Sequence, residues 1–511
     1  MAGLTEMLNA SGGRESAGFL NTIIEQLWPN INVAGSRMIK EIVEPMFATM
    51  LPGPLAGLRF VKIDLGNVPL SIDAVEVHKT EQGGIKLDMD VVWDGKSDVE
   101  LDAHMVPKLG IERVQLKGRM SILLAPLTNI IPLIGAAQVA FINPPSLKLD
   151  FTDAAEVADW VLIDKVIRKC IMDIICSMAV LPNRYLVKLD ANNDYFQTYL
   201  PPVGALRLTV DRAVGLRGPQ VTGAKRLLEK MHIKDTPDYF CKVTLGSEDE
   251  WRTSVKKDSD SDPSWNETHD FLVADDEQDI TVDVQDEDLV GDDDIGIAST
   301  SVRHILLAGG EQELPLTTHQ GEPTEARVVM RAQFFDFAED AAILSGSRAE
   351  QDQGEAGQKE SSRIAGLATV LIGNVRGLQP DYQPGGDDGD EKKKPLPYSV
   401  RVAWGERDFL TAGQNCTTVD DAGNVSYNNH PAFDQAFRFP LTGAALAAEG
   451  GAPAFRMVLL NGKRECGAVE VPFEDVLGAP GMRKEESFDL GAGVSVRARI
   501  ELRALRPAQL D

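Results

Sequence analysis

The chain has 511 residues, of which 51 are basic and 78 are acidic, so its formal net charge at pH 7 is −27. This balance argues against nucleic acid as a partner, because binding to phosphate backbones depends on Lys and Arg. It also argues against constitutive binding to anionic membranes, so membrane attachment should need a switch. Five scattered cysteines, no secretory signal and no apolar run of about 18 residues predict a reduced, cytosolic compartment and no membrane-spanning segment.

Composition divides the chain into three folded regions. The segment 338–363 is small, polar and charged, as a linker should be, and the prolines of YLPPVG end one unit before an alternating strand begins at Gly204. The expected organisation is a tail at 1–18, a first region at 19–200, a second at 204–337, a linker at 338–363 and a third region at 364–511.

The first region is predicted to begin and end with helices. Apolar residues from Phe19 to Leu27 recur at helical spacing, and Pro29 is expected to stop this helix. A last helix, roughly 154–178, carries a wide apolar stripe before Pro182 terminates it.

Two long strands are predicted between these helices. In 85–93 and 113–124 apolar and polar residues alternate, which is typical of strands with one wet face. The region as a whole holds more apolar surface than two short layers require. Two interpretations stay open, an ordinary core or a sheet wrapped around an apolar ligand cavity.

The second and third regions are predicted to be all-β. Short alternating segments separated by turns rich in Gly and Asp have the spacing of a sandwich, and the third region repeats the rhythm of the second. Two copies of one module are expected, and the fold class of the whole chain is α+β.

The segment VQDEDLVGDDDIG, Val284 to Gly296, is strongly acidic. It holds six carboxylates and no basic residue: Asp286, Glu287, Asp288, Asp292, Asp293 and Asp294. Two carboxylates about 4 Å apart repel by roughly 4 kcal/mol at an effective dielectric near 20. Either the segment is a solvated loop or it holds a cation, and calcium takes six to eight oxygen ligands, often carboxylates.

The second region resembles a C2 domain. The resemblance is carried by GALRLTVDRAVGL, PDYFCKVTLG, DPSWNETHDF and the acidic segment itself. It implies a sandwich that binds Ca²⁺ at one end. Carried over by position, the implied ligands are Asp238, Asp286, Asp288 and Asp293. His232 stands where family members usually have another aspartate, which puts the calcium stoichiometry in question.

The third region resembles a degenerate C2 domain. HPAFDQAFRF matches the same segment as DPSWNETHDF, but LLNGKRECGAV has Asn461, Lys463 and Arg464 where aspartates would stand. Those groups cannot assemble a calcium site. The expected roles of this copy are binding of protein or lipid without calcium, or support of the architecture.

The first region resembles the synaptotagmin-like mitochondrial lipid-binding (SMP) domain of extended synaptotagmins, tricalbins and plant synaptotagmins. The motifs are LNTIIEQLWPNI, KIDLGNVPLSIDAVEVH, IERVQLKGRMSILLAPLTNIIPLIGAAQVAFINPP and MAVLPNRYLVKL. The resemblance implies a tubular, TULIP-like fold that binds glycerophospholipid acyl chains in an apolar groove and often forms a homodimer. On strand and helix phase, the expected groove residues are Leu87, Met89, Val91, Leu116, Met120, Ile122, Ile171, Ile175 and Met178.

The resulting hypothesis is a cytosolic, peripheral lipid-transfer protein at membrane contacts, docked on an anionic membrane by a calcium-dependent C2 domain. The alternative is a calcium-dependent tether or scaffold that transfers no lipid. An enzyme is not expected, because the sequence holds neither a GxSxG nucleophile elbow nor an HExxH zinc motif.

Overall fold

The structure is a computed structural model, and twelve ranges of the chain are described. They are 15–80, 83–103, 106–152, 160–216, 237–247, 250–257, 262–287, 292–346, 363–378, 396–419, 425–448 and 451–508. These residues form two compact units. One contains described residues of 2–193 and 206–333, and the other contains Asp194–Ala205 and the described part of Phe334–Gln509.

The long helix of the first unit, α2, spans Gly18–Met50 and contains both Pro29 and Pro45. The prediction that Pro29 stops this helix is therefore wrong. Each proline removes one backbone hydrogen bond, but a buried aromatic residue beside each of them anchors the helix by packing. Trp28 is buried and donates its indole N–H to the Gly66 carbonyl at 2.9 Å, and Phe47 is buried in the core below.

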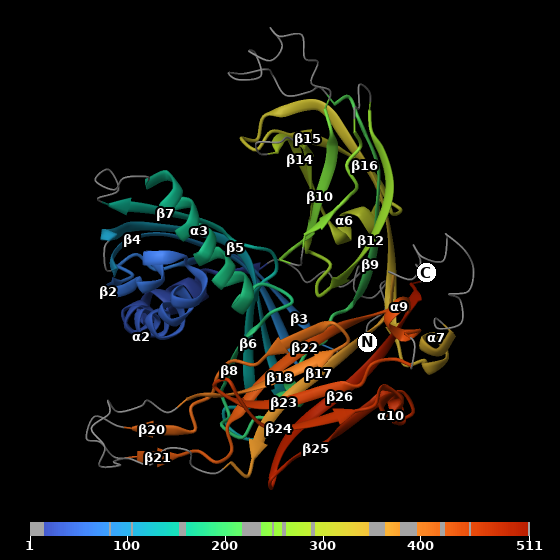
Figure 1. Ribbon diagram of the computed structural model, residues 1–511. Helices are drawn as coiled ribbons and strands as arrows, with labels where there is room; N and C mark the ends of the chain where they lie inside the picture. The colour runs from blue at the N-terminus through green and yellow to red at the C-terminus, as the bar shows by residue number, and fades with distance from the viewer. Residues whose placement is uncertain are drawn as a thin grey trace. The chain divides into compact units, whose positions relative to one another are not determined.

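An eight-stranded antiparallel sheet follows α2, with the order β1-β3-β4-β5-β6-β8, β2 beside β4 and β7 beside β5 (Figure 1). The strands are β1 (Glu15–Ser16), β2 (Arg59–Asp64), β3 (Ser71–Lys79), β4 (Ile85–Ala103), β5 (Val106–Leu127), β6 (Ile134–Phe141), β7 (Ser146–Thr152) and β8 (Tyr185–Lys188). The helix α3 (Trp160–Ala179) ends before Pro182, as expected, and a short 3-10 helix, η1, spans Gly53–Gly57.

One core of this region lies between the two helices and the sheet. Phe47 of α2 and Ile167, Cys170 and Ile174 of α3 pack there with buried residues of β2, β4, β5 and β7. A second cluster lies further along the sheet, where Leu20 and Ile24 of α2 pack against it. The helices therefore cover one face of the sheet, as the amphipathic patterns require.

The first sandwich follows in the same unit. Its strands are β9 (Gly204–Val214), β10 (Tyr239–Leu245), β11 (Trp251–Arg252), β12 (Ser264–Val273), β13 (Asp279–Asp286), β14 (Asp293–Ser301), β15 (Glu311–Thr317) and β16 (Pro323–Ala338). One sheet runs β11-β10-β13-β14-β15, and β9 pairs with β12 and β16. The short helix α6 (Val302–Leu307) joins β14 to β15, and α7 (Ala341–Gly346) follows β16.

The second unit contains the second sandwich. Its strands are β17 (Ile364–Arg376), β18 (Tyr398–Trp404), β19 (Arg407–Leu410), β20 (Thr417–Val419), β21 (Val425–Tyr427), β22 (Ala432–Thr442), β23 (Phe455–Asn461), β24 (Arg464–Val471), β25 (Arg483–Gly491) and β26 (Val494–Pro507). One sheet runs β22-β17-β26-β25 and the other β19-β18-β23-β24. Short helices are α4 (Tyr195–Thr198), α9 (Gly443–Leu446), α10 (Phe473–Leu477) and the 3-10 helix η4 (Pro480–Met482).

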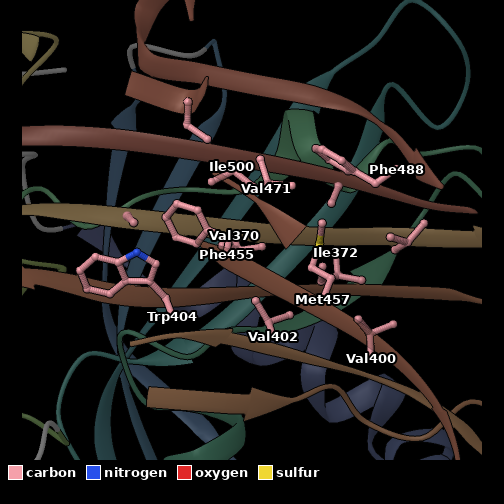
Figure 2. Packing of buried hydrophobic residues seen from close by; sticks show 14 of the residues in the cluster. Val370, Ile372, Val400, Val402, Trp404, Phe455, Met457, Val471, Phe488 and Ile500 are labelled. Atoms are coloured by element: carbon pink, nitrogen blue, oxygen red, sulfur yellow. The ribbon is translucent and has the colours of Figure 1, made fainter. Parts of the chain in front are cut away.

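Alternate residues of these two sheets form one closed apolar core. Figure 2 shows Val370 and Ile372 of β17 facing Val400, Val402 and Trp404 of β18, together with Phe455, Met457, Val471, Phe488 and Ile500. Most of these side chains are fully buried. This sandwich is packed as a solid core, so any ligand has to bind at its outer faces or its loops.

Candidate lipid and calcium sites

The predicted groove residues of β4 and β5 lie on one face of the sheet. Leu87 pairs with Ile122, and Met89 pairs with Met120, so these side chains lie side by side across the two strands. Met89 and Val91 are buried and pack with Leu20 and Ile24 of α2. The other predicted groove residues, Leu87, Leu116, Met120, Ile122, Ile171, Ile175 and Met178, are half-buried.

A continuous half-buried apolar row runs along β5. It includes Leu116, Met120 and Ile122 from the prediction, and it extends to Val114 and Leu124. Solid cores bury such residues almost completely, whereas these aliphatic side chains keep partial exposure, as the lining of an apolar groove would.

The row continues onto β6, which the sequence analysis did not include. Ile122 pairs with Val139 and Met120 pairs with Phe141, so both side chains of β6 lie on the same face as the row on β5. Both are half-buried. The alternation in AAQVAF was the available signal, since every second residue from Ala137 points to this face.

The opposite face of β4 and β5 is charged and contacts the first sandwich, which belongs to the same unit. Lys86 on β4 places its Nζ 2.6 Å from Asp275 of the turn between β12 and β13 and 2.9 Å from Asp88. Arg119 on β5 forms an ion pair with Glu277 of that turn and a second, at 3.0 Å, with Asp90.

The acidic turn Asp275–Glu277 is largely buried by this contact. Burial, followed by the neighbouring Asp275 carboxylate, raises the pKa of Asp276 to about 7, although Arg303 opposes the shift. Arg303 Nε lies 3.0 Å from Asp276 Oδ2. In contrast, the pKa of Asp275 is lowered, because the Lys86 ammonium outweighs the burial that opposes it. The turn therefore holds two adjacent carboxylates with opposite shifts.

At the other end of the first sandwich, strand pairing places two of the predicted calcium ligands opposite each other. Asp286 at the end of β13 pairs with Asp293 at the start of β14, and its Oδ1 accepts the backbone N–H of Asp238 at 2.6 Å. Asp286 is buried. Burial of the Tyr239 hydroxyl, and after it the nearby Asp286 carboxylate, raises the pKa of Tyr239 to about 12. Asp288 and His232 lie outside the described residues.

Basic side chains partly balance the acidic segment. Arg252 forms an ion pair with Glu287 at 2.8 Å, and Lys242 lies 3.7 Å from Asp292. Both cations therefore contact residues beside the proposed calcium ligands. The carboxyl oxygens at this end of the sandwich are hard donors of the kind that Ca²⁺ prefers.

The corresponding hairpin of the second sandwich is short. β23 ends at Asn461 and β24 begins at Arg464, and these two residues pair with each other across Gly462 and Lys463. Gly462 has a φ of 58°, a left-handed conformation that a tight hairpin needs and that glycine adopts without strain. This turn presents an amide and two cations where the first sandwich presents aspartates.

The second sandwich instead binds a segment that comes before the first sandwich in the sequence. Arg497 of β26 donates to both carboxyl oxygens of Asp194, at 3.0 and 2.9 Å, and its guanidinium lies 4.4 Å from the Phe196 ring centroid. Arg499 lies 5.1 Å from the same ring and donates to the Phe196 carbonyl at 2.8 Å. A Cβ at Gly373 would come within 3.3 Å of this ring, so the lack of a side chain at Gly373 leaves room for the Phe196 ring.

Two family models match this chain. The synaptotagmin-like mitochondrial-lipid-binding domain matches residues 13–190, and the C2 domain matches residues 205–316. Extended synaptotagmin-1 of Pongo abelii is 30% identical over 364 residues, which are 70% of this chain and 32% of that protein. Extended synaptotagmin-1 of Mus musculus is 31% identical over 337 residues, which are 65% of this chain and 30% of that protein.

The chain is homologous to the extended synaptotagmins. A solved structure of the SMP, C2A and C2B domains of extended synaptotagmin 2 aligns with 96% of this chain and 100% of its own, with a TM-score of 0.62 and 21% identity. This likeness confirms the predicted fold class, an SMP domain followed by C2 sandwiches. The chain spans about a third of the length of the curated extended synaptotagmins that it matches.

The apolar row lies within the residues that the SMP family model matches. The first sandwich is the C2 domain that the family model matches. Within the described ranges, no helix combines the length and the apolar character needed to cross a bilayer.

Proposed function

We propose that the SMP domain carries a glycerophospholipid in the channel lined by the half-buried row of β5 and β6, and transfers it between closely apposed membranes. The observation that carries this proposal is the row itself, which keeps inward-facing aliphatic side chains partly uncovered. Burial of each acyl methylene against such a surface is worth about 0.8 kcal/mol, so two acyl chains supply ample binding energy. No covalent step is required, and the proposed role is not enzymatic.

Membrane docking is proposed to depend on calcium at the first C2 domain. Asp238, Asp286, Asp288 and Asp293 would hold the ion. Their mutual repulsion becomes attraction once a divalent cation lies among them, and the local negative charge that repels anionic lipid falls. This is the switch that a net charge of −27 calls for in a protein that docks on anionic membranes. The proposed place of action is the cytosolic surface of membrane contact sites, with the SMP domain forming a homodimer.

Transfer of fluorescent phospholipid between donor and acceptor liposomes, with calcium or with chelator, tests both parts of the proposal. We expect calcium to stimulate transfer, and the double substitution Asp286→Asn and Asp288→Asn to abolish the stimulation. Ile122→Trp, which fills the channel, should reduce transfer strongly while leaving calcium-dependent liposome binding intact. Val61→Trp is the matched control, because Val61 lies exposed on β2, outside the row.

The alternative function is a calcium-dependent tether that transfers no lipid. Calcium-dependent liposome binding without transfer, and without lipid that co-purifies with the protein, would support the tether and contradict the lipid carrier. Transfer that is indifferent to both calcium and the double substitution would retain the carrier and contradict the proposed switch.

A further inference from the structure

A second group of potential metal ligands lies on the first C2 domain, apart from the proposed calcium ligands. The Asp–His cluster consists of Asp283 on β13, Asp294 on β14 and His319 in the turn between β15 and β16. One potential ligand atom from each residue lies within 4.8 Å of the other two. His319 Nε2 is 3.1 Å from Asp283 Oδ1, and His319 Nδ1 is 3.7 Å from Asp294 Oδ2.

The cluster faces away from the proposed calcium ligands. Asp293 and Asp294 are consecutive on β14, so their side chains point to opposite faces of the sheet. On β13, Val282 and Val284 are fully buried in the sandwich, which places the intervening Asp283 on the outer face. The His319 side chain is 36% exposed, so an ion can reach the cluster directly from solvent.

A buried amide reaches into this cluster and has an unpartnered oxygen. Gln285 is only 7% exposed, and its Nε2 donates to Asp283 at 2.8 Å and to Asp294 at 3.0 Å. Its Oε1 is buried without a hydrogen-bond partner. Such an orphaned acceptor costs about 1–3 kcal/mol. The amide already draws the two carboxylates toward one point, which is what a cation would do.

Rotation of the Gln285 amide by half a turn exchanges its oxygen and nitrogen with little change in shape. Between two carboxylates alone, the oxygen would be repelled. With a cation between them it becomes a ligand, so one histidine nitrogen, two carboxylates and one amide oxygen can meet at a single point.

We propose that the Asp–His cluster, with the Gln285 amide oxygen as a fourth ligand, binds a divalent transition-metal cation of the Zn²⁺ class. Calcium and magnesium take oxygen ligands, whereas imidazole nitrogen favours Zn²⁺ and its neighbours. Zn²⁺ binds nitrogen and carboxylate oxygen at about 2.0–2.2 Å in a tetrahedron, which sets ligand atoms roughly 3.3–3.6 Å apart. Because Asp283 lies beside Nε2 of His319 and Asp294 beside Nδ1, rotation of the exposed imidazole would have to bring one nitrogen toward both carboxylates. The ion would tie the β15–β16 turn to β13 and β14, the strands that flank the acidic loop.

The test uses the full chain, stripped of metal and titrated with Zn²⁺ by calorimetry while excess Ca²⁺ is present. We expect one equivalent to bind and His319→Gln to weaken this binding by at least about tenfold, as loss of a ligand should. Co²⁺, used as a spectroscopic probe, should show visible absorption bands that the variant lacks. His304→Gln is the matched control, because His304 contacts Thr300 and Gln312 rather than a pair of carboxylates.

Two results would overturn the proposal. If no stoichiometric Zn²⁺ binding is found, or if binding survives His319→Gln unchanged, the cluster is only a contact between His319 and two carboxylates. A loss of Zn²⁺ affinity in Asp286→Asn as large as that in His319→Gln would assign the ion to the acidic loop instead. Circular dichroism of each variant separates these results from misfolding.

Discussion

The two C2 sandwiches contact the rest of their own units through opposite charges. The first offers the carboxylates of Asp275 and Glu277 to Lys86 and Arg119 of the SMP domain. The second offers guanidiniums, of which Arg497 binds the Asp194 carboxylate. One sandwich fold has therefore been adapted to opposite partners by changing outward-facing side chains, while the inward-facing residues stay apolar.

The β13–β14 segment of the first sandwich and the β23–β24 hairpin of the second also differ in charge. The acidic segment of the first begins at Asp286 and pairs again at Asp293, whereas the second sandwich closes the hairpin between Asn461 and Arg464 in two residues. The carboxylates of the first sandwich are suited to a divalent ion, whereas Arg497 of the second sandwich binds Asp194 of the same chain. The proposed calcium binding and the observed internal binding are thus divided between the two copies.

The largest expected effect concerns the aromatic anchor of the second sandwich. Phe196 is 3% exposed between two guanidiniums, so Phe196→Ala removes both the buried ring and its cation–π contacts. We expect a loss of about 3–5 kcal/mol in the free energy of unfolding of the second unit, measured by urea denaturation.

The neighbouring Gln197 is exposed on the same short helix, so Gln197→Ala is the control and should change stability little. If Phe196→Ala costs less than about 1 kcal/mol, the segment is not a structural part of the second unit, and the contrast between the two sandwiches loses one side.

The acidic turn of the first sandwich provides the next effect. The pKa of Asp276 is raised from 3.8 to about 7, so the folded chain keeps a proton there that the unfolded chain loses. The free energy of unfolding should therefore fall as pH rises from about 4 to about 7, by roughly 1–2 kcal/mol once coupling to Asp275 is allowed for. Asp276→Asn, which cannot ionise, should remove this part of the decline.

Urea denaturation of the first unit at several pH values between about 4 and about 8 makes the comparison. Asp73→Asn, at an exposed position of β3, is the control and should leave the slope unchanged. Asp276→Asn and the wild type could instead show the same slope of unfolding free energy against pH. That result would mean that the turn does not keep a buried proton, and that its contact with Lys86 and Arg119 is more open than the structure indicates.

Local patterns predicted many of the helices and strands, but not the tubular fold of the first region. Alternation predicted the long strands β4 and β5, the helix before Pro182 and the two sandwiches, because each pattern reflects which side of one element is buried. The same phase placed Leu87, Met89, Met120 and Ile122 on one face. The resemblance supplied the family, which periodicity alone could not.

The errors and omissions share a different physical cause. Pro29 does not stop α2, because the packing of the adjacent buried Trp28 outweighs one lost hydrogen bond, and the residues that Trp28 packs against lie outside the helix. Asp194 and Arg497 are 303 residues apart in sequence, as the hydrogen bond between them records. Asp283, Asp294 and His319 likewise come close together only because strands β13 to β16 pair side by side. Contacts between distant segments cannot be found by counting neighbours along the chain.

The smallest expected effect tests the charge on which the comparison between the sandwiches rests. Although burial opposes the shift, hydrogen bonds from Arg497 lower the pKa of Asp194. Because the folded-state pKa is lowered, this stabilisation is present at neutral pH and is lost as pH falls through the folded-state value.

Asp194→Asn should cost about 1 kcal/mol at pH 7, since the side chain is 29% exposed and solvent screens the pair. The cost should shrink at acid pH, and a double-mutant cycle with Arg497→Gln should assign most of it to this pair. An asparagine also accepts the N-cap hydrogen bond that Asp194 accepts from the Phe196 backbone, so this bond does not contribute to the cost. A cost that is constant with pH would therefore leave shape rather than charge as what holds the segment on the second sandwich.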